Sequence, residues 1–293
     1  MRQLIFVAVF LCSGTLFSHA DAQSTRIPPI CQKIEPLYSP FPTPQPGDWQ
    51  YVNREPGQTF AQYVRAKPVV ATKKRSILYV QTLGETTDAE REMIEISCDY
   101  LRIFYNLRVK ELPSLPLETV PSRAQRRHPE TGEHQLNATY IIQSIMIPRL
   151  PEDAAAYLMF TTTDLWPGDD WNFCFGLASY QARSGVWSLA RHGDASDPDE
   201  RTQYLRRTLR IAAHETGHMF SIYHCIEYRC GMNGSNSLEE ADGIPLEFCP
   251  QCLAKLRVAT KIHFMNRWKK LLEFYEKHGL EPEAEFVRQC LED

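Results

Sequence analysis

The chain has 293 residues, of which 43% are hydrophobic, which is ordinary for a folded protein with one large domain or two small ones. Its 32 lysine and arginine residues nearly balance 36 aspartate and glutamate residues, so the net charge is only -4. This balance produces no strong field toward nucleic acid or anionic membranes, and it therefore disfavours a polyanion-binding role.

The N-terminal segment has the order of a cleavable secretory signal. A charged start is followed by an apolar run over residues 4–11, and the small residues Ala20 and Ala22 close the segment. The run is too short to span a membrane. We therefore expect residues 1–22 to be a signal peptide and the mature protein to be secreted, without membrane attachment once the signal is removed. The alternatives are a retained N-terminal anchor or a buried apolar helix.

Residues 23–70 are rich in proline and polar side chains, most densely at Pro40, Pro42, Pro44 and Pro46. Proline at this density blocks helix interiors and central strands. We expect this segment to be an extended arm, a linker or a short pro-segment, and we expect the folded domain to occupy residues 71–293.

The rest of the chain alternates between strand and helix patterns. Thr87 and Glu90 form a capping-box pattern in front of apolar residues at three and four spacing, which predicts a core-facing helix. The predicted strands cover residues 76–83, 107–112, 155–163, 173–179 and 186–191, and the further predicted helices cover residues 135–147, 199–220 and 253–277. This alternation favours an α/β fold, with a mostly parallel sheet covered by helices.

The helix predicted over residues 199–220 carries His214, Glu215 and His218. Four residues of helix rotate by about 400°, so both imidazoles leave the same face and can hold one zinc ion. Zinc acidifies water, and Glu215 is placed beside the metal to accept the proton, so that the oxygen can attack a carbonyl polarised by the same ion. This arrangement favours peptide-bond hydrolysis. The alternative is a helix with two satisfied surface histidines.

His224 is the third candidate ligand, six residues beyond His218. On a continuous helix it would point about 120° away from His218. It can reach the metal only if the helix ends after His218. Three neutral imidazoles would then leave one tetrahedral position open, as in catalytic zinc sites.

These residues resemble the signature of the metzincin metallopeptidases, His-Glu-x-x-His-x-x-Gly-x-x-His. The sequence departs from it at Ser221, which stands where the family has glycine. That glycine lets the backbone turn toward the third ligand, and a serine forced to positive φ loses about 1 kcal/mol.

Four clustered cysteines indicate which family of metzincins the chain resembles. Cys225 follows His224 directly, Cys230 comes next, and Cys249 and Cys252 complete two pairs that fit a four-thiolate structural zinc site. In this the chain resembles the archaemetzincins, whose hallmark is the histidine motif followed by such a cysteine set with a methionine between its halves. The resemblance covers about residues 75–275.

The resemblance implies a metzincin-like zincin domain of the α/β (α+β) type. Its expected parts are a twisted, mostly parallel sheet, an active-site helix, C-terminal helices and two zinc ions per chain, one catalytic and one structural. An edge strand over residues 173–179 would line the cleft and pair with an extended substrate. Met232 would be the Met-turn residue under the histidine cage, where it packs and does not ligate. We expect the other cleft walls over residues 164–170 and 182–197.

Cysteine chemistry leaves alternatives open. In an oxidising compartment the four clustered cysteines could form two disulfides, although a two-residue disulfide loop is strained. The scattered Cys31, Cys98, Cys174 and Cys290 allow up to two disulfides of unknown pairing. Cys31 could instead hold the enzyme latent by occupying the open zinc position.

The sequence therefore predicts a zinc metallopeptidase that acts on peptide or protein substrates, with no nucleic-acid partner and as a monomer. A different class of function remains possible, namely a secreted zinc-binding module without turnover, with Ser221 as a first sign of drift. A zinc hydrolase of other acyl bonds is a third possibility.

Overall fold

The computed structural model describes residues 26–168 and 171–292. The predicted signal peptide at residues 1–22 lies outside these described residues. Within them, no helix is both long enough and apolar enough to cross a membrane.

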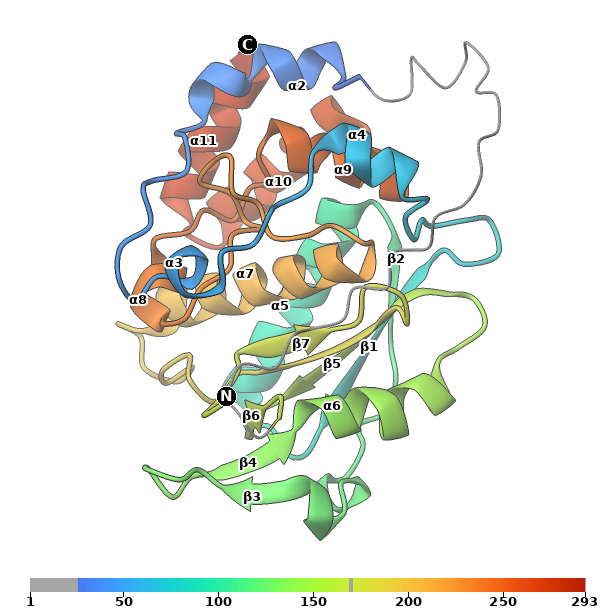
Figure 1. The fold of residues 1–293 in the computed structure, drawn as a ribbon, viewed down its shortest axis with the longest axis vertical. Coiled ribbons are helices and arrows are strands. Elements are labelled where there is room, and N and C mark those ends of the chain that lie inside the picture. The colour runs from blue at the N-terminus through green and yellow to red at the C-terminus, as the bar shows by residue number, and fades with distance from the viewer. Residues whose placement is uncertain (1–25, 169–170, 293) are drawn as a thin grey trace.

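A five-stranded sheet forms the centre of the molecule (Figure 1). Its strands follow the order β2-β1-β5-β8-β7. Neighbouring strands run parallel except for β7, which pairs antiparallel with β8. This confirms the predicted mostly parallel sheet. The strand bounds are β1 (Ile77–Leu83), β2 (Arg108–Glu111), β5 (Ala154–Thr161), β7 (Gly176–Ala178) and β8 (Ser184–Ser188).

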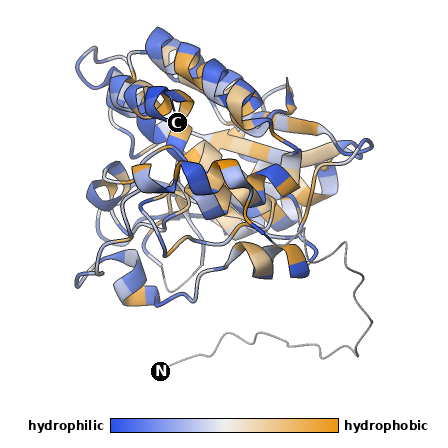
Figure 2. Cartoon of the chain, turned by 90° about the horizontal axis from the view of Figure 1, so that it is seen from above, coloured by the Kyte–Doolittle hydropathy of each residue, from blue (hydrophilic) through white to orange (hydrophobic). Residues whose placement is uncertain are grey.

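Both faces of the sheet are buried, because helices cover each of them. Side chains of a strand alternate between faces, so Leu78 and Val80 of β1 pack with α5 (Asp88–Tyr105) and α7 (Arg201–Met219). Ile77 and Tyr79 pack on the other side, against a helical segment. That segment begins as α6 (Ala138–Tyr140), continues as a π-helical turn (Ile141–Met146) and ends in a 3-10 turn (Ile147–Arg149). Figure 2 shows the apolar strands inside and striped helices outside.

A second, smaller sheet was not predicted. It contains β3 (Gln125–Arg127), β4 (His134–Asn137) and β6 (Asp164–Trp166), preceded by 3-10 turns at Leu117–Thr119 and Ser122–Ala124. The helix predicted over residues 135–147 was therefore wrong at its start. Asn137 ends β4 and caps the following helix, because its Oδ1 accepts a hydrogen bond from Tyr140 N at 2.7 Å.

Four helices follow the active-site helix α7 in the chain: α8 (Leu238–Asp242), α9 (Pro250–Thr260), α10 (Phe264–Lys277) and α11 (Glu281–Glu292). The single helical segment predicted over residues 253–277 is split, since Lys261 adopts φ 58° after α9. Buried Trp268 and Tyr275 on α10 join the core that α5 and α7 share with the sheet.

Residues 26–70 are folded and pack against the domain, so the expected extended arm was wrong in its local structure. The segment contains α2 (Pro29–Lys33), a 3-10 turn (Glu35–Leu37), α3 (Trp49–Asn53) and α4 (Phe60–Arg65). Pro29 occupies the first helical position, where a missing N–H costs nothing. Thr59 and Gln62 form a capping box at α4. Buried Phe60 and Tyr63 anchor this helix in the core beside α9.

The scattered cysteines do not form the expected disulfides, since Cys31, Cys98 and Cys174 are free thiols. Cys31 is completely buried in the hydrophobic core, where burial raises the pKa of its thiol to about 12. It lies in neither cluster of candidate metal ligands in the described part of the chain. The latency hypothesis for Cys31 was therefore wrong.

Candidate active site

Helix α7 ends between His218 and His224, which allows the third histidine to turn back toward the other two. Helix α7 stops at Met219, and Ser221 takes the left-handed backbone conformation with φ 63°. Ile222 N then donates a hydrogen bond to Gly217 O at 3.1 Å, which reverses the chain. The serine side chain offsets part of the conformational cost, because its Oγ accepts from Val69 N and donates to Tyr180 O, each at 3.1 Å.

The three histidine side chains converge on one point. The Nε2 atoms of His214 and His218 lie 3.0 Å apart, and each lies 3.2 Å from Nε2 of His224. Zinc–nitrogen bonds of about 2.0–2.1 Å in a tetrahedron place such atoms about 3.3 Å apart. The spacing therefore fits a single zinc ion.

Each imidazole is oriented by a hydrogen bond from its other nitrogen. His214 Nδ1 donates to Gly231 O at 2.9 Å, and His218 Nδ1 donates to Ile222 O at 2.7 Å. His224 Nδ1 donates to the carboxylate of Glu55 at 2.6 Å. These bonds leave the three Nε2 lone pairs facing one another, which is favourable only when a cation lies between them.

Burial keeps the helical histidines neutral. Burial first, and the neighbouring imidazoles second, lower the pKa of His214 well below its usual value and that of His218 to about 3. A neutral imidazole is the form that binds a metal. The donor set therefore matches zinc in chemistry as well as in spacing.

Glu215 lies between the histidines and the sheet edge. A Cβ added at Gly176 of β7 would lie 2.9 Å from Glu215 Oε1, so only glycine leaves room for the carboxylate. Burial raises the pKa of Glu215 to about 8, while the Arg210 guanidinium acts to lower it. The carboxylate makes no hydrogen bond to any described residue, and it lines the cavity described below.

Met232 packs directly under the histidines. A Cβ at Gly217 would lie 2.5 Å from the Met232 sulfur, so the thioether contacts the helix between His214 and His218. The side chain is fully buried, and its backbone O accepts a hydrogen bond from Cys225 N at 2.8 Å. Met232 packs without reaching the ligand group, as the resemblance implied.

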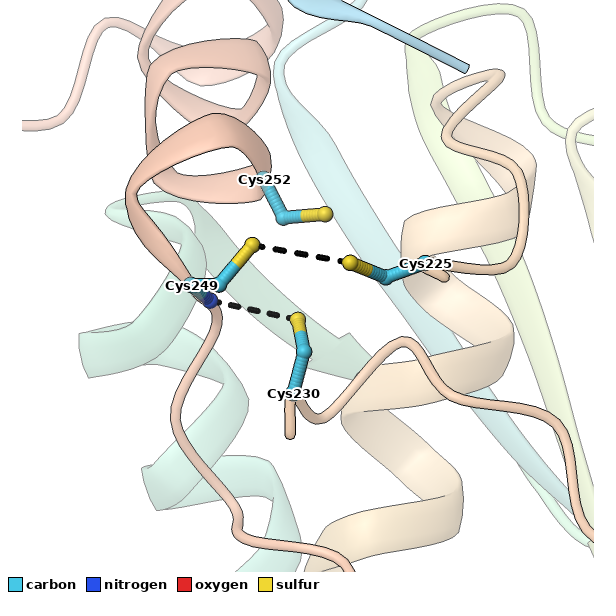
Figure 3. A group of neighbouring side chains, drawn as sticks. All are labelled: Cys225, Cys230, Cys249 and Cys252. Carbon is cyan, nitrogen blue, oxygen red and sulfur yellow. Dashed lines mark hydrogen bonds between the residues drawn. The ribbon is translucent and has the colours of Figure 1, made fainter. Parts of the chain in front are cut away.

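The four clustered cysteines point toward a common centre (Figure 3). The sulfurs of Cys225 and Cys249 lie 3.6 Å apart, whereas a disulfide requires about 2.05 Å. A tetrahedron of zinc–sulfur bonds of about 2.3 Å gives about 3.8 Å between sulfurs. Backbone N–H of Cys249 donates to the sulfur of Cys230 at 3.1 Å, as expected for a thiolate. The cluster therefore fits a four-thiolate zinc site.

The histidines open into a cavity of about 670 Å³. One wall is the segment from Asn172 to Ala178, which includes β7, and confirms the predicted edge strand. The other walls differ from the prediction: within residues 164–170 and 182–197 the described lining includes only Pro167, and Trp187 is fully buried in the core. Trp49 supplies a wall instead and stacks on Trp171 with 6.0 Å between ring centroids.

Sequence reasoning missed Trp49 and Glu55, which α3 and the loop after it bring to the site. The rings of Trp49 and His224 meet in a T-shaped arrangement with 5.2 Å between their centroids, and Trp49 Nε1 donates a hydrogen bond to Glu55 at 3.0 Å. Glu55 lies 169 positions from His224, so no local pattern connects them. Arg210 was also missed, although its place one turn before His214 on the same helix face could have indicated it.

A helix that presents two imidazoles and a carboxylate, joined by a third imidazole from the following loop beside the edge of a sheet, defines a zinc metallopeptidase. Comparison with known proteins gives the same class, because residues 154–258 match the model of peptidase family M54. Human archaemetzincin-2 is 33% identical over 84% of this chain and 76% of its own length, and the mouse archaemetzincin-2 is 30% identical over 82% and 75%. The chain belongs to the archaemetzincin family.

A solved structure supports this at the level of the fold. The crystal structure of archaemetzincin from Methanopyrus kandleri matches with a TM-score of 0.52 and 26% identity. The match covers 98% of that chain and 65% of this one. The present chain therefore has about a third of its residues outside the fold that the two proteins share.

Proposed function

We propose that His214, His218 and His224 hold the catalytic zinc ion of this metallopeptidase and that Glu215 is its general base. The observation that carries this proposal is the convergence of the three Nε2 atoms within 3.2 Å of one another, beside a carboxylate in an open cavity. Cys225, Cys230, Cys249 and Cys252 hold a second zinc ion that stabilises the fold.

A zinc ion bound at the histidines supplies a Lewis acid that polarises the scissile carbonyl and acidifies water. Glu215 accepts the proton of the attacking water on a carboxylate oxygen, and later delivers it to the leaving nitrogen. The carboxylate is suited to this role because no described residue occupies its oxygens by hydrogen bonding. The neutral imidazoles would add no negative charge to a zinc ion held at this site.

The substrate is a peptide in extended form. β7 pairs with β8 on one side only, and its other edge lies along the cavity. Backbone groups on that edge are available to an added strand. We therefore expect the substrate residues around the scissile bond to bind largely through their main chain.

The test is Glu215→Gln. We expect the variant to keep two zinc ions per chain and to lose about 10²–10⁴-fold in kcat on a peptide substrate, the usual contribution of general base catalysis. Metal analysis and peptide hydrolysis are measured on the same samples. If wild type with both zinc ions cleaves no peptide, the chain is a zinc-binding module without turnover, the second candidate. Hydrolysis at the wild-type rate by Glu215→Gln would remove the proposed base.

We also propose that residues 1–22 direct export and that the secreted protein is a monomer. The order of charge, apolar run and small residues at the N-terminus supports export. N-terminal sequencing of protein collected from the medium tests it, and we expect the chain to start at Gln23. Light scattering of that material tests the monomer.

A further inference from the structure

Arg210 lies one helical turn before His214, on the face of α7 that lines the cavity. Arg210 is only 6% exposed, and it lines the cavity. Because one turn of helix rises about 5.4 Å, Arg210 is placed to reach the substrate residue next to the scissile bond.

The hydrogen-bond partners of Arg210 are neutral. Nε donates to Ala241 O at 3.1 Å, and Nη2 donates to Ser235 Oγ at 2.6 Å. Nη1 makes no hydrogen bond to a residue that the structure describes. By contrast, Arg206 and Arg207 on the same helix each pair with a carboxylate, Glu283 and Asp242 respectively.

A buried guanidinium without an ion-pair partner is costly. Among the described carboxylates of the cavity, Glu55 is bonded to His224 and Trp49, and Glu215 lies beside the edge strand. Neither of them forms an ion pair with Arg210 in the described part of the chain. The carboxylates of Glu215, Asp242 and Glu240 act on the guanidinium electrostatically, but none of them bonds to it. An incoming anion would therefore be its first directly bonded charged partner among the described groups.

The walls beside Arg210 restrict what the anion can be attached to. Trp49 packs against Gly234, where an added Cβ would lie 2.5 Å from its ring, and the Trp171 ring stacks on Trp49. Ser235 and Asn236 add polar groups to the cavity lining, and Ser235 Oγ accepts the hydrogen bond from Arg210. Aromatic walls with a cation at their base suit a short side chain or chain end that terminates in a carboxylate.

We propose that Arg210 binds a carboxylate carried by the substrate residue next to the scissile bond, so that the enzyme prefers peptides acidic at that place. This inference rests on the proposed function. The carboxylate has two possible sources with the same chemistry: an aspartate or glutamate side chain, or the free C-terminus of a short peptide.

The experiment uses quenched fluorescent alanine-rich peptides. In the first comparison, a peptide with a single Glu is matched with the same peptide carrying Gln instead, for each position around the cleavage site. Another pair ends one residue beyond that site, as a free acid or as an amide. For wild type, we expect kcat/KM to be about 10–100-fold higher for the carboxylate member of one pair, the range of a charge-assisted hydrogen bond. The pair that shows the preference identifies the source.

Variants assign the preference to Arg210. We expect Arg210→Gln to cleave both members at nearly equal rates and Arg210→Lys, which keeps the charge but not the fork, to retain part of the preference. Arg201→Gln is the matched control, since Arg201 lies on the same helix and pairs with Glu92 away from the cavity. It should keep the wild-type preference. Zinc content of the cysteine cluster verifies folding of each variant.

Calorimetric titration separates this inference from the proposed function. The same peptides are titrated into the zinc-loaded Glu215→Gln protein, so binding is measured without turnover. Tighter binding of the carboxylate member supports the role of Arg210 even if wild type cleaves nothing. Equal binding and equal cleavage of both members by wild type would overturn it, and so would a preference that persists in Arg210→Gln.

Discussion

At the residue scale, the hydrogen bond from His224 to Glu55 links the histidine that lies outside α7 to a distant segment. His224 lies in a loop rather than on α7, and its ring contacts the carboxylate of Glu55 and, in a T-shaped arrangement, the ring of Trp49. Carboxylate partners of this kind orient a ligand histidine and raise its basicity. Glu55 therefore acts as a positioning residue for the third ligand.

We expect Glu55→Gln to lower the zinc affinity of the histidine site by about 10–100-fold. Competition with a chelating dye measures the two sites separately, and the cysteine cluster should retain its affinity. Glu35→Gln is the control, because Glu35 lies in the same N-terminal segment but accepts a hydrogen bond from Tyr228. Unchanged affinity in Glu55→Gln would contradict the positioning role.

His192 determines part of the acid sensitivity of the fold. It is buried, with Nδ1 3.1 Å from Thr208 Oγ1, and burial together with Arg207 and Arg210 lowers its pKa to about 3. The unfolded chain protonates this residue near pH 6.5, whereas the folded chain does not. Its contribution to stability is therefore complete above about pH 6.5 and falls by about 1.4 kcal/mol per pH unit below it, until about pH 3.

The variant His192→Gln tests this dependence. Between pH 7.5 and 5.5 we expect the free energy of unfolding to fall by about 1.4 kcal/mol less in the variant than in wild type. Urea unfolding at the two pH values supplies the comparison. Parallel pH profiles for the two proteins would exclude His192 as a source of the acid sensitivity.

At the scale of elements, the cysteine cluster supports the histidine cluster. Cys225 adjoins His224, Cys230 lies one residue before Gly231, whose carbonyl orients His214, and Cys249 occupies the N-cap position of α9. A metal held by these thiolates fixes the loop that carries the third ligand and the turn under the helix. We infer that the reverse dependence is weaker, because the Nδ1 atoms of the three histidines bond to Gly231 O, Ile222 O and Glu55 and to none of the described cysteines.

This asymmetry gives a prediction about metal content. We expect Cys249→Ser to lose zinc from both sites, and His218→Asn to lose it from the histidine site alone. Elemental analysis of the two purified variants yields near zero and near one zinc ion per chain, respectively. A Cys249→Ser protein that still binds zinc at the histidines would show that the two sites are independent.

The sequence predicted the elements whose signals are local. The capping box at Thr87 located the start of α5, and the β-branched run located β1, as the structure confirms. The small sheet escaped prediction because β3, β4 and β6 have at most four residues each, and because β6 pairs with β4 across an intervening helix and strand. The helix break at Ser221 could be predicted only from the demand that His224 reach the metal.

At the scale of the whole molecule, the segment over residues 26–70 forms a wall of the active site. Val69 N and the side chain of Gln58 bind Ser221, Asn236 Nδ2 binds Gly47 O, and Tyr63 OH binds Phe220 O at 2.9 Å. These contacts connect residues 26–70 to the turn at Phe220 and Ser221, which precedes His224, and to Asn236, which follows it. An inhibitory pro-segment would block the open position, whereas this segment supplies Glu55 and Trp49 to the site.

A cleavable linker tests this interpretation. A processing-protease site is inserted in the exposed turn at Lys73 and Lys74. Cutting it should never raise kcat/KM, and removing the N-terminal fragment in mild denaturant should lower both activity and zinc at the histidine site. A protein with uncut linker, treated identically, is the control. Activation on cutting would identify the segment as a pro-segment after all.

The pairing of Glu55 with His224 also constrains when the enzyme can first act. The N-terminal partner is made early, but the histidine turn comes late, and Cys249 and Cys252 come later still. During synthesis, the nascent chain therefore lacks a complete metal centre until most of it has left the ribosome. An unfinished copy of the chain therefore has no complete metal centre with which to cleave a peptide.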